Sequence, residues 1–100
     1  MISEIRGLRY RGAAAASVVS MLAPGDPIQL RRDLDNKYDS NAVMMLALGT
    51  FIGYVQADLA VTVAEYLDEG AELRAHVVDR TDRNGIPYVE VTLPFTPPPT

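Results

Sequence analysis

Polar and apolar residues alternate in short blocks along this chain, and the blocks predict six strands. Alternation over residues 28–33 and 71–80 is typical of half-buried strands, whereas 41–48 is apolar on both faces, as expected of a central strand. The expected strands cover residues 2–10, 28–33, 41–48, 51–56, 71–80 and 86–93. Gly7 inside the first strand predicts a bulge or a close approach of another backbone.

One segment, residues 57–68, predicts a clear helix. Its apolar residues recur at helical spacing and form a single stripe that consists of Leu59, Ala60, Val63, Ala64 and Leu67. Asp58 suits the positive N-terminal end, and Gly70 suits a C-terminal stop. The alanine-rich segment 13–22 favours a second, short helix, with an irregular strand as the alternative.

Turn signals separate these elements. Residues 24–27 (Pro-Gly-Asp-Pro), Gly49-Thr50 and the type I′ signal Asn84-Gly85 are predicted turns. The tail 94–100 contains four prolines and is expected to be flexible. Residues 1–93 are therefore predicted to form one domain, mainly β with one clear helix. The expected architecture is a small six-stranded OB-like or SH3-like barrel with the helix at one end.

Composition excludes several classes of protein. The 100 residues contain no cysteine, so disulfides and thiolate metal sites are excluded. No segment approaches the ~20 apolar residues that span a bilayer, and a soluble, cytoplasmic protein is expected. The net charge of −4 argues against non-specific nucleic-acid binding. The acidity lies in the second half: residues 1–41 hold six basic and five acidic side chains, and residues 42–100 hold three and eight. An anion site in the first half is therefore permitted.

The most polar stretch, Leu30–Ala42, is longer than a simple hairpin connection and carries a tyrosine among its Asp and Asn residues. Its three acids do not fit an EF-hand calcium loop, because Lys37, Tyr38 and Met44 stand at positions five, six and twelve from Asp33. No metal site or other cofactor is expected.

Catalysis is not expected either. The only histidine, His76, lies on the polar side of its strand and has no obvious partner for a nucleophilic triad or a metal. The chain also has no glycine-rich phosphate loop. The sequence therefore favours a protein that is not an enzyme.

A binding pocket without catalysis is the remaining chemical interpretation. Tyrosines offer faces on which bases stack, and arginines contact phosphates. Arg9 with Tyr10, and Tyr38 with Asp39, supply both if the first strand adjoins the polar stretch. A carboxylate such as Asp39 can accept a hydrogen bond from a hydroxyl, which a strand terminus offers. The alternative is that Tyr38 packs on the barrel while Asp39 and Asn41 only close the loop.

At these residues the chain resembles the HIRAN domain family, over Ile5 to about Val78. The matching pieces are Gly7-Leu8-Arg9-Tyr10, Pro24-Gly25-Asp26-Pro27 with Ile28–Leu30 and Arg32, Asp35–Val43, Ile52-Gly53-Tyr54-Val55 and Ala57-Asp58-Leu59-Ala60. The resemblance implies an OB-like β-barrel that binds single-stranded DNA and captures its 3′-hydroxyl end. It also implies a setting in DNA repair at replication forks, with a helicase or other DNA-processing protein as a partner in trans.

The resemblance implies roles for individual residues. Tyr10 and Tyr38 would flank the terminal base, Asp39 would accept a hydrogen bond from the 3′-hydroxyl, and Arg9 would meet a phosphate. Asn36 and Asn41 would shape the loop, Asn36 would also touch the nucleotide, and Tyr54 completes the implied set of DNA-binding residues. The sequence departs from the family at Lys37, which replaces a proline, at Tyr54, where the fork-remodelling helicase has a histidine, and at Ala57, where it has a phosphate-binding lysine. A protein-interaction or regulatory module of the same fold, without DNA binding, is the alternative.

Overall fold

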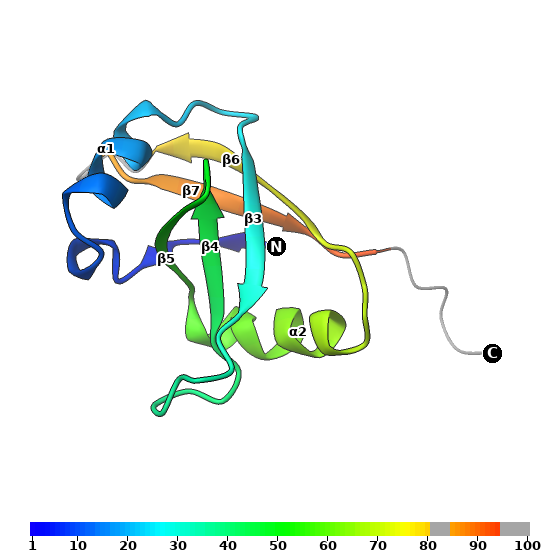
Figure 1. Ribbon diagram of the computed structural model, residues 1–100. Coiled ribbons are helices and arrows are strands. Elements are labelled where there is room, and N and C mark those ends of the chain that lie inside the picture. The colour runs from blue at the N-terminus through cyan, green and yellow to red at the C-terminus, as the bar shows by residue number, and fades with distance from the viewer. Residues whose placement is uncertain (81–84, 95–100) are drawn as a thin grey trace.

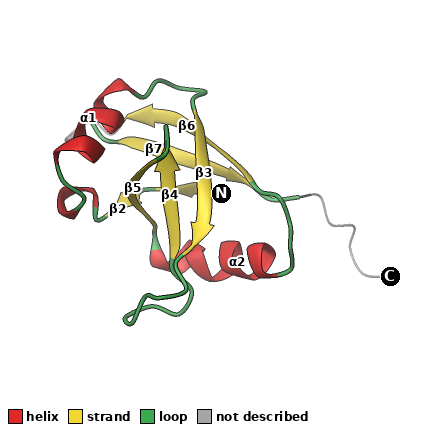
Figure 2. Cartoon of the chain, viewed as in Figure 1, coloured by secondary structure: helices red, strands yellow, loops and turns green. Residues whose placement is uncertain are grey.

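The chain folds into a nearly closed antiparallel barrel of seven strands with two α-helices (Figures 1 and 2). The computed structural model describes residues 1–80 and 85–94. The strands are β1 (Ile2–Ser3), β2 (Ile5–Arg6), β3 (Pro27–Arg32), β4 (Val43–Ala47), β5 (Thr50–Val55), β6 (Arg74–Arg80) and β7 (Pro87–Thr92). The helices are the 3₁₀ turn η1 (Leu8–Tyr10), α1 (Ala13–Met21) and α2 (Ala57–Asp68).

The strands follow the order β1-β7-β6-β3-β4-β5-β2, so the first two strands of the chain lie at the two ends of the sheet. β1 pairs with β7 and β2 pairs with β5, and only Glu4 separates β1 from β2. The single strand predicted over 2–10 is therefore divided between two partners, which raises the strand number from six to seven. The mainly β, OB-like class of fold is confirmed.

Hydrogen bonds to Gln56 hold the point where the chain changes partner. The buried Ser3 hydroxyl accepts from the Gln56 amide (3.0 Å) and donates to the Glu4 carbonyl (2.7 Å). The Glu4 amide in turn donates to Gln56 Oε1 (2.9 Å). These bonds bring the two ends of the sheet together and so close the barrel.

The strand predicted through Leu8–Tyr10 is wrong, because the chain turns there. Gly7 has φ 75°, in the left-handed region, and its carbonyl accepts from the Tyr10 amide (3.1 Å) to form the 3₁₀ turn. The β4–β5 turn is also shifted by one residue from the prediction. Leu48 and Gly49, with φ 51° and 76°, make the turn, and Ala47 pairs with Thr50. Positive φ at both central residues is what a type I′ turn requires.

The remaining elements agree with the sequence to within three residues at either end. α2 spans the predicted residues, and segment 13–22 is a helix rather than the irregular strand. α2 covers one end of the barrel with Ala60, Val63 and Ala64 buried, while α1 packs against β5 at another end (Figure 2). His76 lies on the outer face of β6 and faces Glu90 of β7 at 3.6 Å. Asn84 of the predicted turn and residues 95–100 of the tail lie outside the described residues.

Gly53 permits the close contact between β2 and β5 that completes the barrel. A Cβ at this position would lie 2.6 Å from the Arg6 carbonyl oxygen and 2.6 Å from Ile5 Cγ2. The register of β5 against β4 also shifts here, between Met45 and Leu46, as at a β-bulge. Only glycine lets the two backbones approach this closely.

Gly53 has φ 155°, which L side chains rarely adopt, so we expect Gly53→Ala to destabilise the fold by about 3 kcal/mol, from overpacking and unfavourable φ together. Urea unfolding followed by far-UV circular dichroism measures the loss. Gly49→Ala is the matched control, because Gly49 also has positive φ but has open space where a Cβ would stand. A loss no larger than that of the control would contradict the role assigned to the close contact.

Candidate nucleic-acid interface

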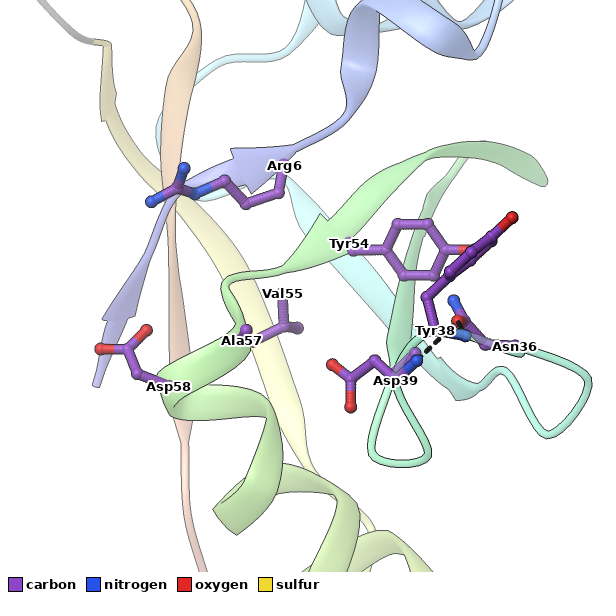
Figure 3. A pocket seen from close by; sticks show the side chains of 9 residues that line it. Arg6, Asn36, Tyr38, Asp39, Tyr54, Val55, Ala57 and Asp58 are labelled. Carbon is purple, nitrogen blue, oxygen red and sulfur yellow. Dashed lines mark hydrogen bonds between the residues drawn. The ribbon is translucent and has the colours of Figure 1, made fainter.

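A pocket of about 550 Å³ lies where the β3–β4 loop (residues 33–42) meets β5, β2 and the start of α2 (Figure 3). We call it the loop pocket. Its lining consists of Arg6, Asn36, Tyr38, Asp39, Ala42, Tyr54, Val55, Ala57 and Asp58. Segments far apart in the sequence therefore contribute to one site.

The loop is held in place by Arg32, the last residue of β3. Its guanidinium donates to the carbonyl oxygens of Ser40 (2.8 Å) and Ala42 (2.9 Å) and to Asp68 Oδ1 at the end of α2 (2.9 Å). The Arg32 side chain is only 14% exposed. Burial of a charge is costly unless it is paired and hydrogen-bonded, and here both conditions are met. Arg32 thus fixes the returning arm of the loop against the barrel and the helix.

Two side chains inside the loop shape its tip. Asn36 Oδ1 accepts from the backbone amides of Tyr38 and Asp39, both at 2.9 Å. Asp39 Oδ1 accepts from the Asn41 amide, also at 2.9 Å. Such side-chain to backbone bonds substitute for secondary structure in tight turns. Asn36 and Asp39 therefore fix the backbone from which the Tyr38 side chain projects.

Tyr38 is 100% exposed, so the alternative in which it packs on the barrel is wrong. Asp39 does close the loop through Oδ1, as that alternative expected. Its other oxygen, Oδ2, has no hydrogen-bond partner within residues 1–80 and 85–94. Figure 3 shows the Asp39 carboxylate directed towards the start of α2, on the pocket side of the loop. One residue thus combines a structural bond with an acceptor that remains available.

Tyr54 connects the loop to the face of β5. Its hydroxyl donates to Asp33 Oδ2 at 2.6 Å. The pKa of Tyr54 is raised above its usual 10.0, first by burial and then by the hydrogen bond to Asp33 and the charge of that carboxylate. Asn36 and Arg11 act in the opposite direction. The Tyr54 ring meets Phe51 edge to face, with centroids 5.2 Å apart. Tyr54 is therefore a fixed wall of the pocket.

The other predicted site residues lie elsewhere. Arg9 and Tyr10 stand on η1, and they contact each other: Arg9 Nη2 donates to the Tyr10 hydroxyl at 2.7 Å, with the guanidinium 4.8 Å from the ring centroid. Neither lines the loop pocket. Asn41 lines a separate depression along α2.

The structure thus brings together four of the seven predicted residues, Asn36, Tyr38, Asp39 and Tyr54. A role in DNA binding remains a prediction for all seven.

Sequence reasoning missed Arg6 and Asp58 as lining residues. Arg6 pairs in register with Tyr54, and its guanidinium contacts Glu4 at 2.9 Å. Asp58 accepts a hydrogen bond from Gln56 Nε2 at 2.9 Å. The lining therefore carries one basic and two acidic side chains. The available signal was the place of Arg6 in the predicted strand 2–10, and this place becomes informative only when the partner strand is known.

The part of the chain that the structure describes contains no group of three or more His, Asp or Glu placed to bind a metal ion. Within those same residues, no helix combines the length and the apolar character needed to cross a membrane.

Comparison with known proteins gives one family and two similar structures. The family described as the HIRAN domain matches residues 1–95. The crystal structure of a protein from Lactobacillus plantarum is similar with a TM-score of 0.79 and 22% identity, over 90% of this chain and 87% of that chain. The crystal structure of the HIRAN domain of human HLTF is similar with a TM-score of 0.71 and 22% identity, over 91% and 71%. No curated protein gives a significant sequence match.

We expect Tyr54→Phe to lower the free energy of unfolding by about 1–2 kcal/mol at pH 7, because it removes a hydrogen bond to a charged group. The folded pKa of Tyr54 lies above the unfolded value, so this stabilisation is fully present below pH 10 and is lost as pH rises through the folded pKa. Urea unfolding between pH 7 and pH 11 should show the gap between wild type and variant narrowing above pH 10.

The control is Tyr66→Phe, since the Tyr66 hydroxyl on α2 has no hydrogen-bond partner in the described residues. A gap for Tyr54→Phe that stays constant up to pH 11 would show that the bond to Asp33 does not stabilise the fold.

Proposed function

This chain belongs to the HIRAN domain family, and we propose that it is a non-catalytic module that binds single-stranded DNA at its 3′-hydroxyl end. One observation carries the proposal. The fully exposed ring of Tyr38 stands next to the Asp39 carboxylate at a pocket of about 550 Å³, and hydrogen bonds fix the backbone of both residues. An aromatic face beside a hydroxyl acceptor suits a terminal nucleoside.

The chemistry of the pocket favours a hydroxyl end over a phosphorylated one. A base stacked on Tyr38 gains about 1–3 kcal/mol irrespective of its sequence. Asp39 Oδ2 then accepts a hydrogen bond from the 3′-hydroxyl. A 3′-phosphate in the same place would meet Asp39 and Asp58 with Arg6 as the one basic side chain of the lining. The two carboxylates of the pocket therefore support selectivity for a free 3′-hydroxyl end.

Arg9, Tyr10 and Asn41 enter the proposal through the family resemblance. The resemblance gives Arg9 a phosphate contact, Tyr10 the second face of the terminal base and Asn41 a place in the loop that presents Asp39. Arg9 and Tyr10 are exposed on η1, outside the loop pocket. A helicase or other DNA-processing protein as a partner in trans likewise rests on the resemblance.

The absence of catalysis in this proposal rests on the family, which consists of binding domains. The competing function is a protein-interaction module. It is favoured because Ala57 and Asp58 at the start of α2 offer no basic side chain for a DNA phosphate. Absence of binding to any single strand at low salt, where electrostatic attraction is strongest, would decide for it.

The first test is Tyr38→Ala. We expect the dissociation constant for a short single strand with a free 3′-hydroxyl to rise by about 5- to 150-fold, the equivalent of one lost base stack. Stability should not change, because the ring contributes no burial. Fluorescence anisotropy with a 5′-labelled oligothymidylate measures the affinity. Leu34→Ala is the matched control, since Leu34 is exposed on the same loop but outside the pocket lining; equal losses in both variants would contradict stacking on Tyr38.

The second test is Asp39→Asn. The amide oxygen can still accept from the Asn41 amide, so the loop keeps its shape while the charge is lost. We expect the wild type to prefer 3′-hydroxyl over 3′-phosphate ends about tenfold or more, as a charged hydrogen bond allows, and the variant to lose most of that preference. Asp35→Asn, exposed on the same loop and outside the lining, should retain it. Equal binding of the wild type to both ends would remove the end-capture proposal.

A further inference from the structure

Arg11 lies between η1 and α1 and faces two aromatic rings of β5. Its amide donates to the Leu8 carbonyl at 2.9 Å, which fixes the backbone at the end of η1. Its guanidinium carbon lies 4.7 Å from the centroid of the Phe51 ring and 5.8 Å from that of Tyr54. Cations at these distances from a ring face are attracted by it. Main chain and rings together hold the guanidinium in one place.

This guanidinium has no anionic partner in the described part of the chain. The acid–base contacts there are Arg6–Glu4, Arg32–Asp68 and His76–Glu90. Asp33, on the neighbouring loop, receives its hydrogen bonds from Tyr54 at 2.6 Å and Asn36 at 3.5 Å. Arg11 Nε is the one buried side-chain nitrogen or oxygen without a hydrogen-bond partner among the described residues. The Arg11 guanidinium is therefore positioned by the two rings and not by a hydrogen bond or an ion pair within the described residues.

We propose that Arg11 is a phosphate-binding residue that takes a backbone phosphodiester of the strand whose 3′ end occupies the loop pocket; the proposal rests on the proposed function. The Tyr54 ring is shared by the two sites, since it lines the pocket and faces Arg11. A strand leaving the pocket along β5 therefore passes Arg11. The side chain is partly exposed, so its terminal nitrogens can present the planar fork that matches phosphate oxygens.

Charge supports the choice of a phosphodiester as the ligand. The loop pocket carries two acidic side chains and one basic one, which suits a neutral hydroxyl end. The chain of phosphates that follows needs a cation outside this pocket, and the start of α2 offers only Ala57 and Asp58. Arg11 lies on the N-terminal half of the chain, where basic residues outnumber acidic ones. The aromatic rings hold the guanidinium before the ligand arrives, which lowers the entropy cost of binding.

The test measures how the affinity of the full chain for a short 3′-hydroxyl oligothymidylate depends on salt. Each phosphate contact on a single strand contributes about 0.7 to the slope of log affinity against log salt concentration. We expect Arg11→Met, which keeps contact with both rings, to reduce the slope by about 0.7 and the low-salt affinity by about tenfold. Arg11→Lys should retain the slope. Arg74→Gln, an exposed arginine on β6 outside the pocket, should leave it unchanged.

A second measurement locates the phosphate and does not depend on the stability of a variant. Oligothymidylates with one uncharged methylphosphonate linkage, moved stepwise from the 3′ end, should bind the wild type more weakly at one position near that end. At the same position they should bind Arg11→Met no more weakly than the unmodified strand. In the wild type, the Nε–H resonance of Arg11 should shift on addition of the oligonucleotide and not on addition of thymidine.

The outcomes separate this proposal from the proposed function. If 3′-blocked and free strands bind equally, but Arg11→Met still reduces the salt slope and removes the effect of the methylphosphonate linkage, end capture fails and the phosphate site stands. If 3′-end preference holds but Arg11→Met leaves the slope and the linkage profile unchanged, the phosphate site is overturned and end capture stands. If the wild type binds no strand at low salt, both are overturned.

Discussion

The barrel depends on one crossing point, at Ser3 and Glu4, where the chain leaves β7 and joins β5. Within two residues the backbone must change from pairing with β7 to pairing with β5. The fully buried Ser3 hydroxyl makes this possible because it accepts a hydrogen bond from the backbone amide of Gln56. Gln56 also precedes the first residue of α2. The contact that closes the barrel therefore also fixes where the helix begins, and it brings Arg6, Tyr54 and Ala57 around one pocket.

The loop that completes this pocket is built on a different principle. It has no regular hydrogen-bond ladder, so side chains that bond to backbone groups set its shape together with a few backbone–backbone bonds, such as that from the Asp33 amide to the Ala42 carbonyl (3.0 Å). Arg32 holds one arm from outside, Asn36 and Asp39 organise the tip, and the Tyr54–Asp33 bond ties the other arm to β5. Each of these residues is partly or mostly buried, whereas Tyr38 between them is fully exposed. Rigid support around one exposed ring is the arrangement that a binding site needs, since little entropy is then lost on binding.

The sequence was informative wherever local periodicity decides structure. The apolar stripe of α2 predicted its ends, and the contiguous run Asn36–Asp39 identified a loop whose residues lie together whatever the topology. The sequence was uninformative where the structure depends on a strand that is distant in the sequence. The sequence placed Ile2 and Arg6 on one predicted strand but could not reveal that Ile2 pairs with β7 and Arg6 with β5. For the same reason Arg6 was missed, since its position beside Tyr54 is a matter of register. The Leu48–Gly49 turn shows that turn geometry can override the preference of a leucine.

Arg32 contacts the loop through main-chain carbonyl oxygens, which every amino acid possesses. The exposed side chain of Ser40 takes no part in this anchor, and Leu34, Asp35 and Lys37 also point to solvent. Substitutions at these positions would therefore change the outer surface of the loop without moving the residues that line the pocket. A barrel anchored in this way can acquire new surface contacts beside an unchanged pocket, while the constraints on its interior stay the same.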